Sequence, residues 1–485
     1  MNVFHAGMLK ARFFAWNRRG VLHITDMVTE QIIALPDANN DGVADTSYIA
    51  ASSFSDAHSM IFVQDTMYVA EPTKVWRLLD RDGDGIYETR SVFIDSIPNG
   101  GVFNHYTRTI LFDSVQKAFF LSVGAPCDAC RADNPERSAI LRFNADGTGR
   151  RIFATGLRNA IGLAIEPSTG KLWATNADRN GLGEEKPEEM ITSVPEGSFH
   201  GWPLAYSTLD GIVLGNNTQI QTGRIRAAWT NFQANANYRA MLPLTNTDSS
   251  RFSRLKLAEA LLPAHSTPMG LQFCTTPTFP RNFRNGAFVA VHGSFDTSSR
   301  KLAVGYNVVF MARDAVSGAY FTQDFLTGFL TDSARYKRWG RPVGIGFSPQ
   351  GDLFVSSDDN TGSLYRISYQ APSGVSQPLA ANDFPSALYP QSARSSDALW
   401  VDFLAPKAGE LEIVIADVRG VVIASASRVI AAGRGTVSLS EILRDAASMP
   451  LSAGLYFYRL TLRNGAQSIS SVSVQSQGTM LLQGR

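Results

Sequence analysis

The chain has 485 residues, of which 44% are hydrophobic and 18% charged, and its formal net charge at pH 7 is +1. A chain of this length can bury a large core. Its nearly balanced charge excludes a bulk field that would attract nucleic acid or an anionic membrane. No apolar run reaches about 18 residues, so we expect no transmembrane segment.

A phrase of short strands recurs through the first three quarters of the chain. In its best-formed copy, residues 151–176, hydrophobic alternation predicts three strands separated by a Gly turn and a Pro-Ser-Thr-Gly turn. The middle strand occurs six times: ARFFAW (11–16), AHSMIF (57–62), TRTILF (107–112), AIGLAI (160–165), PMGLQF (268–273) and PVGIGF (342–347). Repeats of about 45 to 65 residues with about four strands each are typical of propeller blades. We therefore predict an all-β fold with a six-bladed β-propeller over residues 1–369.

The two ends of the predicted propeller should meet. VFHAGM (3–8) precedes the first inner strand and has the character of an outer strand. We expect it to complete the last blade beside residues 362–369, which would leave no free sheet edge. The fifth repeat is obscured by an insertion at roughly residues 204–262.

Two local motifs have no decisive interpretation. The acidic runs at residues 37–45 and 80–88 match the first half of a calcium loop but lack its final Glu, so an EF-hand is excluded. Weak calcium loops and plain Asp-Gly turns remain equally open there. Cys127 and Cys130 form either a local disulfide or two surface thiols, and no second Cys or His pair has the spacing of a zinc site.

The composition changes after Tyr369. Residues 370–398 are rich in Pro, Ser and Ala, which predicts a linker. Residues 399–485 contain alternating strands with short turns, such as GELEIVIAD and GLYFYRLTL, which predict a small immunoglobulin-like β-sandwich. Such a module is also typical of carbohydrate-binding domains and of spacer domains.

Cationic and imidazole side chains gather at the predicted entrances of the inner strands. Each such histidine taken alone would be better explained as structural, but the recurrence favours a site. Positive groups at nearly every entrance would repel one another unless an anion lay among them, so the pattern predicts a multiply anionic ligand. The residues concerned are Arg12, His58, His105, Arg108, Arg158, Asn159, His265, Arg338 and Arg341.

Several phrases then resemble a known family. HYTRTILF, ATGLRNAIGLAIEPSTGKLWATN, LLPAHSTPMGLQF and WGRPVGIGFSPQGDLFVSSDD are similar, in unbroken order over residues 3–369, to the glucose/sorbosone dehydrogenases, including L-sorbosone dehydrogenase-like proteins. These are six-bladed propellers that use pyrroloquinoline quinone (PQQ) with Ca2+. The resemblance implies an oxidoreductase that transfers hydride from an aldose or sugar aldehyde to PQQ and passes electrons to an external acceptor other than NAD.

The resemblance also implies roles for individual residues. His105 matches the general base, and Arg158 matches the arginine that stabilises the reactive quinone oxygen. Other matched cofactor positions are Arg12, Asn159, His292, Arg338 and Arg341, and the calcium loop corresponds to the backbone of Asp178 and Arg179. The sequence departs from the family pattern at Ala160, Asn180, Phe295 and Asn307.

The C-terminal block has a resemblance of its own. ALYPQSARSSD, VIADVRGVVI and LSAGLYFYRLTL are similar to the sorting domains of type IX secretion, although Gln391 and Ser392 replace the usual Asn-Pro. This implies a secreted, cell-surface or periplasmic protein whose partner is the secretion machinery and whose leader is absent from the printed sequence.

Two other functions remain as alternatives. One is a calcium-dependent sugar-lactone hydrolase, and the other is a propeller that binds glycans without chemistry. A hydrolase of this kind needs a metal lined by carboxylates in the channel, whereas the predicted entrances carry Arg and His, which favours the quinone. No motif identifies the sugar or the natural electron acceptor.

Overall fold

The computed structural model divides into two compact units, Met1–Gln370 and Ala371–Arg485. Its described residues are the whole chain except 102–103, 209–210, 215–218, 221–247, 281–282, 296–300, 315–317, 360–361, 370–388, 397, 406–407, 418–421, 432, 440, 443–455, 465–466 and 476–485. Most of the predicted insertion and most of the predicted linker therefore lie outside the described residues. None of the described helices is long and apolar enough to span a membrane.

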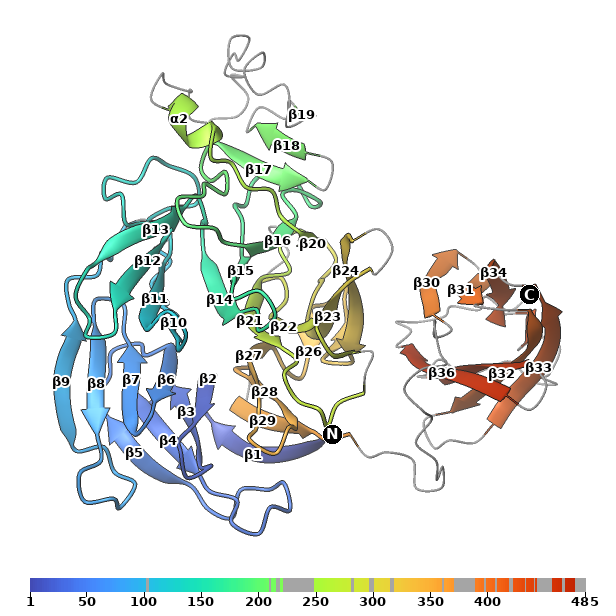
Figure 1. The fold of residues 1–485 in the computed structure, drawn as a ribbon, viewed down its shortest axis with the longest axis horizontal. Coiled ribbons are helices and arrows are strands. Elements are labelled where there is room, and N and C mark those ends of the chain that lie inside the picture. Colours follow the sequence, from blue (N-terminus) through green and yellow to red (C-terminus); the bar gives the residue numbers. More distant parts are fainter. Residues whose placement is uncertain are drawn as a thin grey trace. The chain divides into compact units, whose positions relative to one another are not determined.

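The first unit is a ring of six four-stranded antiparallel sheets (Figure 1). The first strands of successive sheets contact one another around the ring, including the first strand of the last sheet with that of the first. The predicted six-bladed propeller is therefore confirmed. In chain order the sheets are β2(Ala11–Trp16), β3(Leu22–Asp26), β4(Gln31–Leu35) and β5(Tyr48–Ser52); β6(Ser59–Val63), β7(Thr66–Ala70), β8(Val75–Leu79) and β9(Thr89–Ile94); β10(Ile110–Asp113), β11(Ala118–Val123), β12(Ala139–Asn144) and β13(Arg151–Thr155); β14(Ala160–Ile165), β15(Leu172–Asn176), β16(Glu189–Ser193) and β20(Ala260–Leu262); β21(Pro268–Phe273), β22(Ala287–Val291), β23(Asn307–Arg313) and β24(Tyr320–Leu326); and β27(Pro342–Phe347), β28(Leu353–Ser357) and β29(Gly362–Ile367) with β1(Asn2–Met8).

The N-terminal strand closes this ring, as predicted. β1 pairs antiparallel with β29, so that Asn2 lies opposite Arg366 and Met8 opposite Gly362. Phe4 of β1 is buried against Phe354, with ring centroids 5.0 Å apart. The last sheet is thus built from both ends of the propeller sequence, and its outer edge is the first strand of the chain.

Adjacent blades are joined by apolar packing and by buried hydroxyl groups. Thr175 of β15 accepts a hydrogen bond from Gly162 N (2.8 Å) and donates one to Met269 O in the next blade (2.7 Å). A Cβ on residue 162 would collide with that Met269 carbonyl, so only glycine allows the approach. These bonds hold the inner strands in a fixed relation, and thereby fix where their entrances meet.

The acidic turns stabilise hairpin loops with their own carboxylates. Asp37 accepts a hydrogen bond from Gly42 N, and Asp80 accepts bonds from Gly83 N and Gly85 N. Within the described ranges, the one group of acidic side chains close enough to hold a metal consists of Asp80, Asp82 and Glu88, whose oxygens lie within 4.8 Å of one another.

The second unit contains two antiparallel sheets. One has the order β30(Tyr389–Ser396), β31(Ala398–Ala405), β34(Gly433–Ser438), and the other β33(Val422–Ile430), β32(Gly409–Asp417), β35(Tyr456–Asn464), β36(Gln467–Gln475). Val437 of the first sheet shares one buried cluster with Leu411 and Leu460 of the second, which makes the unit a β-sandwich as predicted.

One boundary differs from the sequence prediction. β30 lies inside residues 370–398, which we predicted to be linker, so the strands begin at Tyr389 rather than near Leu399. The segment YPQSARSS has no alternating apolar residues, and its small polar composition is that of a linker.

Candidate functional site

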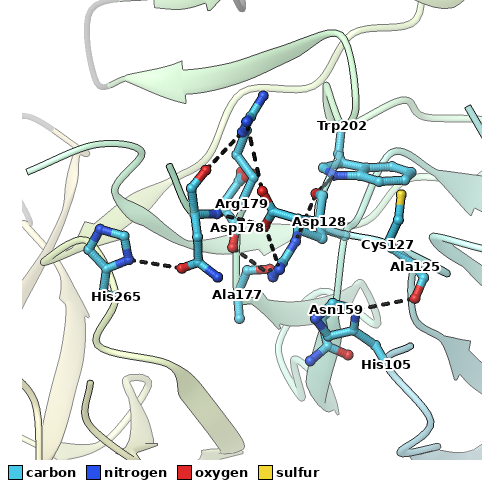
Figure 2. Close-up of polar contacts among 12 residues, drawn as sticks. His105, Ala125, Cys127, Asp128, Asn159, Ala177, Asp178, Arg179, Trp202 and His265 are labelled. Carbon is cyan, nitrogen blue, oxygen red and sulfur yellow. Dashed lines mark hydrogen bonds and ion pairs between the residues drawn. The ribbon is translucent and has the colours of Figure 1, made fainter. Parts of the chain in front are cut away.

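The topology of the fourth blade brings several predicted site residues to one rim. Arg158 and Asn159 directly precede β14, and Asp178 and Arg179 follow β15. Because β14 and β15 are antiparallel, with Ala160 opposite Asn176, the start of one strand and the end of the other lie side by side. His105 joins them from the third blade, as Figure 2 shows.

His105 has the hydrogen bonding of a neutral base. Its Nδ1 lies 3.1 Å from Ala125 O, and since a carbonyl can only accept, Nδ1 bears the proton and Nε2 keeps its lone pair. Burial and then the charge of Arg158 lower the pKa of His105 to about 3, so the imidazole is neutral at physiological pH. A Cβ on residue 124 would lie 2.8 Å from the Asn159 Oδ1 atom and collide with His105, so glycine is required here.

Arg158 is held on two sides. Its Nε donates to Asp128 O (3.1 Å) and its Nη2 to Asp128 Oδ1 (2.8 Å), while Nη1 donates to Asp178 O (2.8 Å) and, weakly, to Ala177 O (3.5 Å). These bonds use four of the five N–H groups of the guanidinium. One N–H on Nη2 has no partner among the described residues, and it is available to a ligand.

The predicted metal loop contains buried oxygen atoms. Asp178 N donates to Glu189 Oε2 (2.6 Å), and Arg179 N donates to Asp178 Oδ1 (2.7 Å). Asp178 Oδ2 is buried and has no partner among the described residues. Burial raises the pKa of Asp178 to about 6 and that of Glu189 to about 8. Buried carboxyl groups of this kind suit a cation, which would stabilise their ionised forms.

His265 supports the same loop from the fifth blade. Its Nδ1 lies 3.1 Å from Asn180 Oδ1 and its Nε2 lies 2.9 Å from Gly183 O, on the far side of Asp178 from Asp128 (Figure 2). Both ring nitrogens thus face polar atoms of the loop, which places His265 as an anchor of that loop.

A second cluster surrounds Asp358, which directly follows β28. Its carboxylate pairs with Arg12 Nη1, and its Oδ1 lies 2.7 Å from His292 Nε2. Arg12 Nε donates to His58 Nδ1 (3.1 Å), and Arg341 Nε donates to the backbone oxygen of His292 (3.1 Å). The structure thus unites Arg12, His292 and Arg341 around a carboxylate that sequence reasoning missed.

The electrostatics of this cluster favour one ionised carboxylate. Burial raises the pKa of Asp358, but His292, which is protonated in the acid range where this carboxyl would titrate, and Arg12 lower it by more, so the pKa lies below its usual range. Burial lowers the pKa of His292 to about 4, which outweighs the opposing effect of Asp358. Asp358 is therefore the counterion of Arg12, and the neutral His292 donates to it.

Arg338 has a separate counterion. It belongs to β26(Lys337–Arg338), and its Nε donates to Asp359 Oδ2 (2.6 Å). Its guanidinium also lies 5.7 Å from the centre of the Tyr306 ring.

These ion pairs correct one step of the sequence argument. We expected the cations at the entrances to repel one another unless an anionic ligand lay among them. Asp128, Asp358 and Asp359 already neutralise them, and they stand in loops after strands rather than at strand entrances. Repulsion among these cations alone therefore does not require a ligand.

Uncompensated positive charge remains beneath His105. Arg108 donates to His105 O (2.7 Å) and Arg137 to Gly124 O (2.6 Å), and neither has a carboxylate partner in the described part of the chain. Burial lowers the pKa of Arg108 to about 9 and that of Arg137 to about 10. Both remain cationic at neutral pH, so an anion is favoured near His105.

The cysteine pair of the polar loop is bridged. Cys127 and Cys130 form a disulfide, with Asp128 inside the small ring that it closes. Of the departures from the family pattern, Phe295 is 77% exposed and Asn307 donates to Asp324 Oδ1 (2.6 Å).

The fold and this rim define a six-bladed propeller with a polar site at one end of its inner strands. The chain belongs to the TrAA12-like family, whose model matches residues 1–370. An uncharacterized protein of Borreliella burgdorferi is 26% identical over 278 residues, which are 56% of this chain and 63% of that protein. The match therefore spans less than two thirds of that relative.

Solved structures have the same fold at low sequence identity. The pyranose dehydrogenase PQQ domain of Coprinopsis cinerea, in its holo form, is 20% identical with a TM-score of 0.59, covering 76% of this chain and 94% of that one. A calcium structure of the Trichoderma reesei family AA12 enzyme is 18% identical (TM-score 0.59; 75% and 95% covered). The apo soluble aldose sugar dehydrogenase of Escherichia coli is 14% identical (TM-score 0.52; 75% and 98% covered).

The family match and these folds confirm the resemblance of the propeller to the PQQ sugar dehydrogenases. They do not bear on the second unit, and its resemblance to type IX sorting domains remains a prediction.

Proposed function

We propose that this chain is a PQQ-dependent oxidoreductase that oxidises an aldose or a related sugar aldehyde and delivers electrons to an external acceptor other than NAD. Membership of the TrAA12-like family supports the proposal. The observation that carries it is that His105 and Arg158 lie at the same rim. His105 is a neutral imidazole with an available Nε2, and Arg158 is a fixed guanidinium with one spare N–H.

The residues present fit an anionic quinone and a calcium ion. Three N–H groups of Arg12, one on Nη1 and two on Nη2, have no partner among the described residues and could serve a carboxylate. Asn159 Oδ1 and Asp178 Oδ2 are buried without partners in the described ranges, which suits a hard cation or a cofactor donor. The cofactor would be held by Arg12, Asn159, His292, Arg338 and Arg341, and calcium by the backbone of Asp178 and Arg179.

The chain's own residues would move the proton. When bound, PQQ would supply the two-electron acceptor for hydride. His105 accepts the hydroxyl proton of the sugar at Nε2 while its Nδ1–H stays bonded to Ala125 O, so the ring does not have to turn. An anion bound beside the imidazole would raise the pKa of His105 from the low value that burial and Arg158 give it. Arg158 places its positive charge where negative charge develops.

Reconstitution tests the proposal. The purified chain is titrated with PQQ in the presence and absence of Ca2+, and dye reduction is then followed across a panel of aldoses and sugar aldehydes. Binding of PQQ and sugar-dependent reduction are expected. Failure to bind PQQ together with no dye reduction would contradict the proposal.

The same samples separate the alternatives. A lactone hydrolase would open sugar lactones with Ca2+ and without PQQ, and a glycan-binding propeller would bind sugars with no turnover of either kind.

We also propose that the second unit directs export through the type IX machinery, which would place the protein in the periplasm, at the cell surface or outside the cell. The C-terminal phrases quoted above support this. Residues 371–485 fused behind a leader and a reporter should appear at the surface of a bacterium that has this pathway, and not of one that lacks it.

A further inference from the structure

Asp128 contacts four residues around the candidate site, Arg158, Arg179, Asn180 and Trp202. Its Oδ1 accepts hydrogen bonds from Arg158 Nη2 (2.8 Å) and Asn180 N (2.8 Å), and its Oδ2 lies 3.7 Å from Arg179 Nη2. Its backbone oxygen accepts from Arg158 Nε (3.1 Å) and Trp202 Nε1 (2.8 Å). Figure 2 shows Asp128 between Trp202 and Arg179.

These contacts fix the plane of the Arg158 guanidinium. Asp128 accepts two of its four hydrogen bonds and provides its only carboxylate in the described part of the chain. The side chain of Arg158 is 6% exposed, so water offers little replacement for a lost partner. Without the Asp128 carboxylate, the guanidinium would keep only bonds to the backbone carbonyl oxygens of residues 128, 177 and 178 and would have no charged partner.

The loop that carries Asp128 has no strand or helix of its own. It lies between β11 and β12, and the Cys127–Cys130 disulfide closes it around Asp128. Such a ring reduces the number of conformations available to the loop. Arg131 adds a second fixed point, because it forms a bidentate pair with Asp248 (2.9 and 2.6 Å), next to the helix α2(Ser249–Phe252).

We propose that Asp128, held in the loop that the Cys127–Cys130 disulfide closes, is a positioning residue that sets the orientation of Arg158 for the cofactor. The inference rests on the proposed function. It adds a residue that contacts neither the sugar nor the reacting atoms, and it assigns a purpose to the disulfide.

The test compares Asp128→Ala with Glu136→Gln. Glu136 is a matched control because it lies in the same segment between β11 and β12, and its carboxylate pairs with Arg150 rather than with Arg158. Asp128→Ala should weaken PQQ binding by about 10- to 100-fold, the scale for a group that orients a ligand-binding residue, and should lower kcat at saturating PQQ. Asp128→Glu should recover part of both, because it keeps the charge. Equal PQQ affinity in Asp128→Ala and Glu136→Gln would overturn the proposal.

A double-mutant cycle shows whether Asp128 acts through Arg158. In an Arg158→Ala background, Asp128→Ala should have little further effect on the dissociation constant of PQQ. An undiminished effect in that background would mean that Asp128 acts independently, and the positioning role would be wrong.

Two further measurements separate this proposal from the proposed function. In the protein without PQQ, Asp128→Ala should speed amide hydrogen exchange at Asn180 by at least about tenfold, because its N–H loses its acceptor. This result does not depend on whether PQQ binds. Reducing the disulfide of the folded protein with a phosphine, which converts it to two thiols, should shift PQQ affinity in the same direction as Asp128→Ala. Unchanged exchange, or unchanged affinity after complete reduction, would count against the role of Asp128 or of the disulfide, respectively.

Discussion

His105 and Arg158 are held by the protein in different ways, so their loss should have different signatures. The His105 ring has one hydrogen bond to a carbonyl, whereas the Arg158 guanidinium has four, one of which is an ion pair with Asp128. His105→Gln should keep PQQ affinity but lose turnover by about 100-fold, the usual scale of a general base. Arg158→Ala should weaken PQQ binding and turnover together.

Holo-protein titration and single-turnover reduction measure the two quantities separately. If both side chains merely satisfied channel carbonyls, each substitution would cost stability and neither would separate binding from rate. Normal turnover in His105→Gln would exclude it as the base.

The pair formed by Arg12 and Asp358 should dominate the stability of the other cluster. Their side chains are 6% and 4% exposed, so removing one leaves a buried charge without its counterion. Asp358→Ala should lower the free energy of unfolding by about 3–5 kcal/mol. Denaturation in urea measures this.

The double variant Arg12→Leu/Asp358→Leu is the comparison that isolates the pair. It should be less destabilised than Asp358→Ala, because no unpaired charge remains. A double variant as unstable as the sum of the two single ones would contradict this account.

At the scale of single residues, the cationic side chains of the site could be predicted from the sequence, whereas their carboxylate counterions could not. Arg158 and Arg12 were found because strand entrances can be predicted from hydrophobic alternation. Asp128 stands in an aperiodic loop, and Asp358 is 346 positions from Arg12, so no local pattern reports either pairing. The rule that strand ends meet neighbouring strand entrances at one rim could have suggested Asp358.

Strands were predicted well where turns are marked by glycine and proline. The inner strands ARFFAW, AIGLAI, PMGLQF and PVGIGF coincide with β2, β14, β21 and β27. β30 was missed because nothing in its composition distinguishes it from a linker. Alternation therefore identifies a strand only when one of its faces is apolar.

The strand β1 should matter for cooperativity more than its seven residues suggest. Deleting residues 1–8 exposes the edge of β29 and removes buried Phe4 and Met8. We expect a lower melting temperature and a broader transition, because the ring is opened. Calorimetry of the deletion variant measures both, and a transition like that of the parent chain would contradict the expectation.

At the scale of the whole molecule, buried histidines should make the protein without cofactor sensitive to acid. Burial lowers the pKa of His23 to about 4 and that of His200 to about 3. In the unfolded chain these two imidazoles bind protons below about pH 6.5, whereas in the folded chain they stay neutral until the pH reaches their lowered pKa values. Stability is therefore fully present above that pH and is lost as the pH falls towards 4.

His200→Gln tests this expectation. It should reduce the slope of unfolding free energy against pH, between about pH 4 and 6, by about 1.4 kcal/mol per pH unit, which corresponds to one proton. His5→Gln is the comparison, because His5 is only half-buried and should change the slope less. An unchanged slope in His200→Gln would show that this imidazole titrates equally in both states.

The pairing of β1 with β29 also sets an order of events during synthesis. β1 leaves the ribosome before the other strands of the propeller, yet its partner β29, residues 362–367, is made only after five blades have been completed. Throughout that interval the nascent chain has an unpaired strand, β1, at one end and an incomplete ring of blades at the other. Both expose unpaired strand edges that can bind other chains. Fragments that end before residue 362, as produced by ribosome stalling, would therefore be prone to aggregate. Synthesis of the last few residues of the propeller determines when the ring can close and this exposure ends.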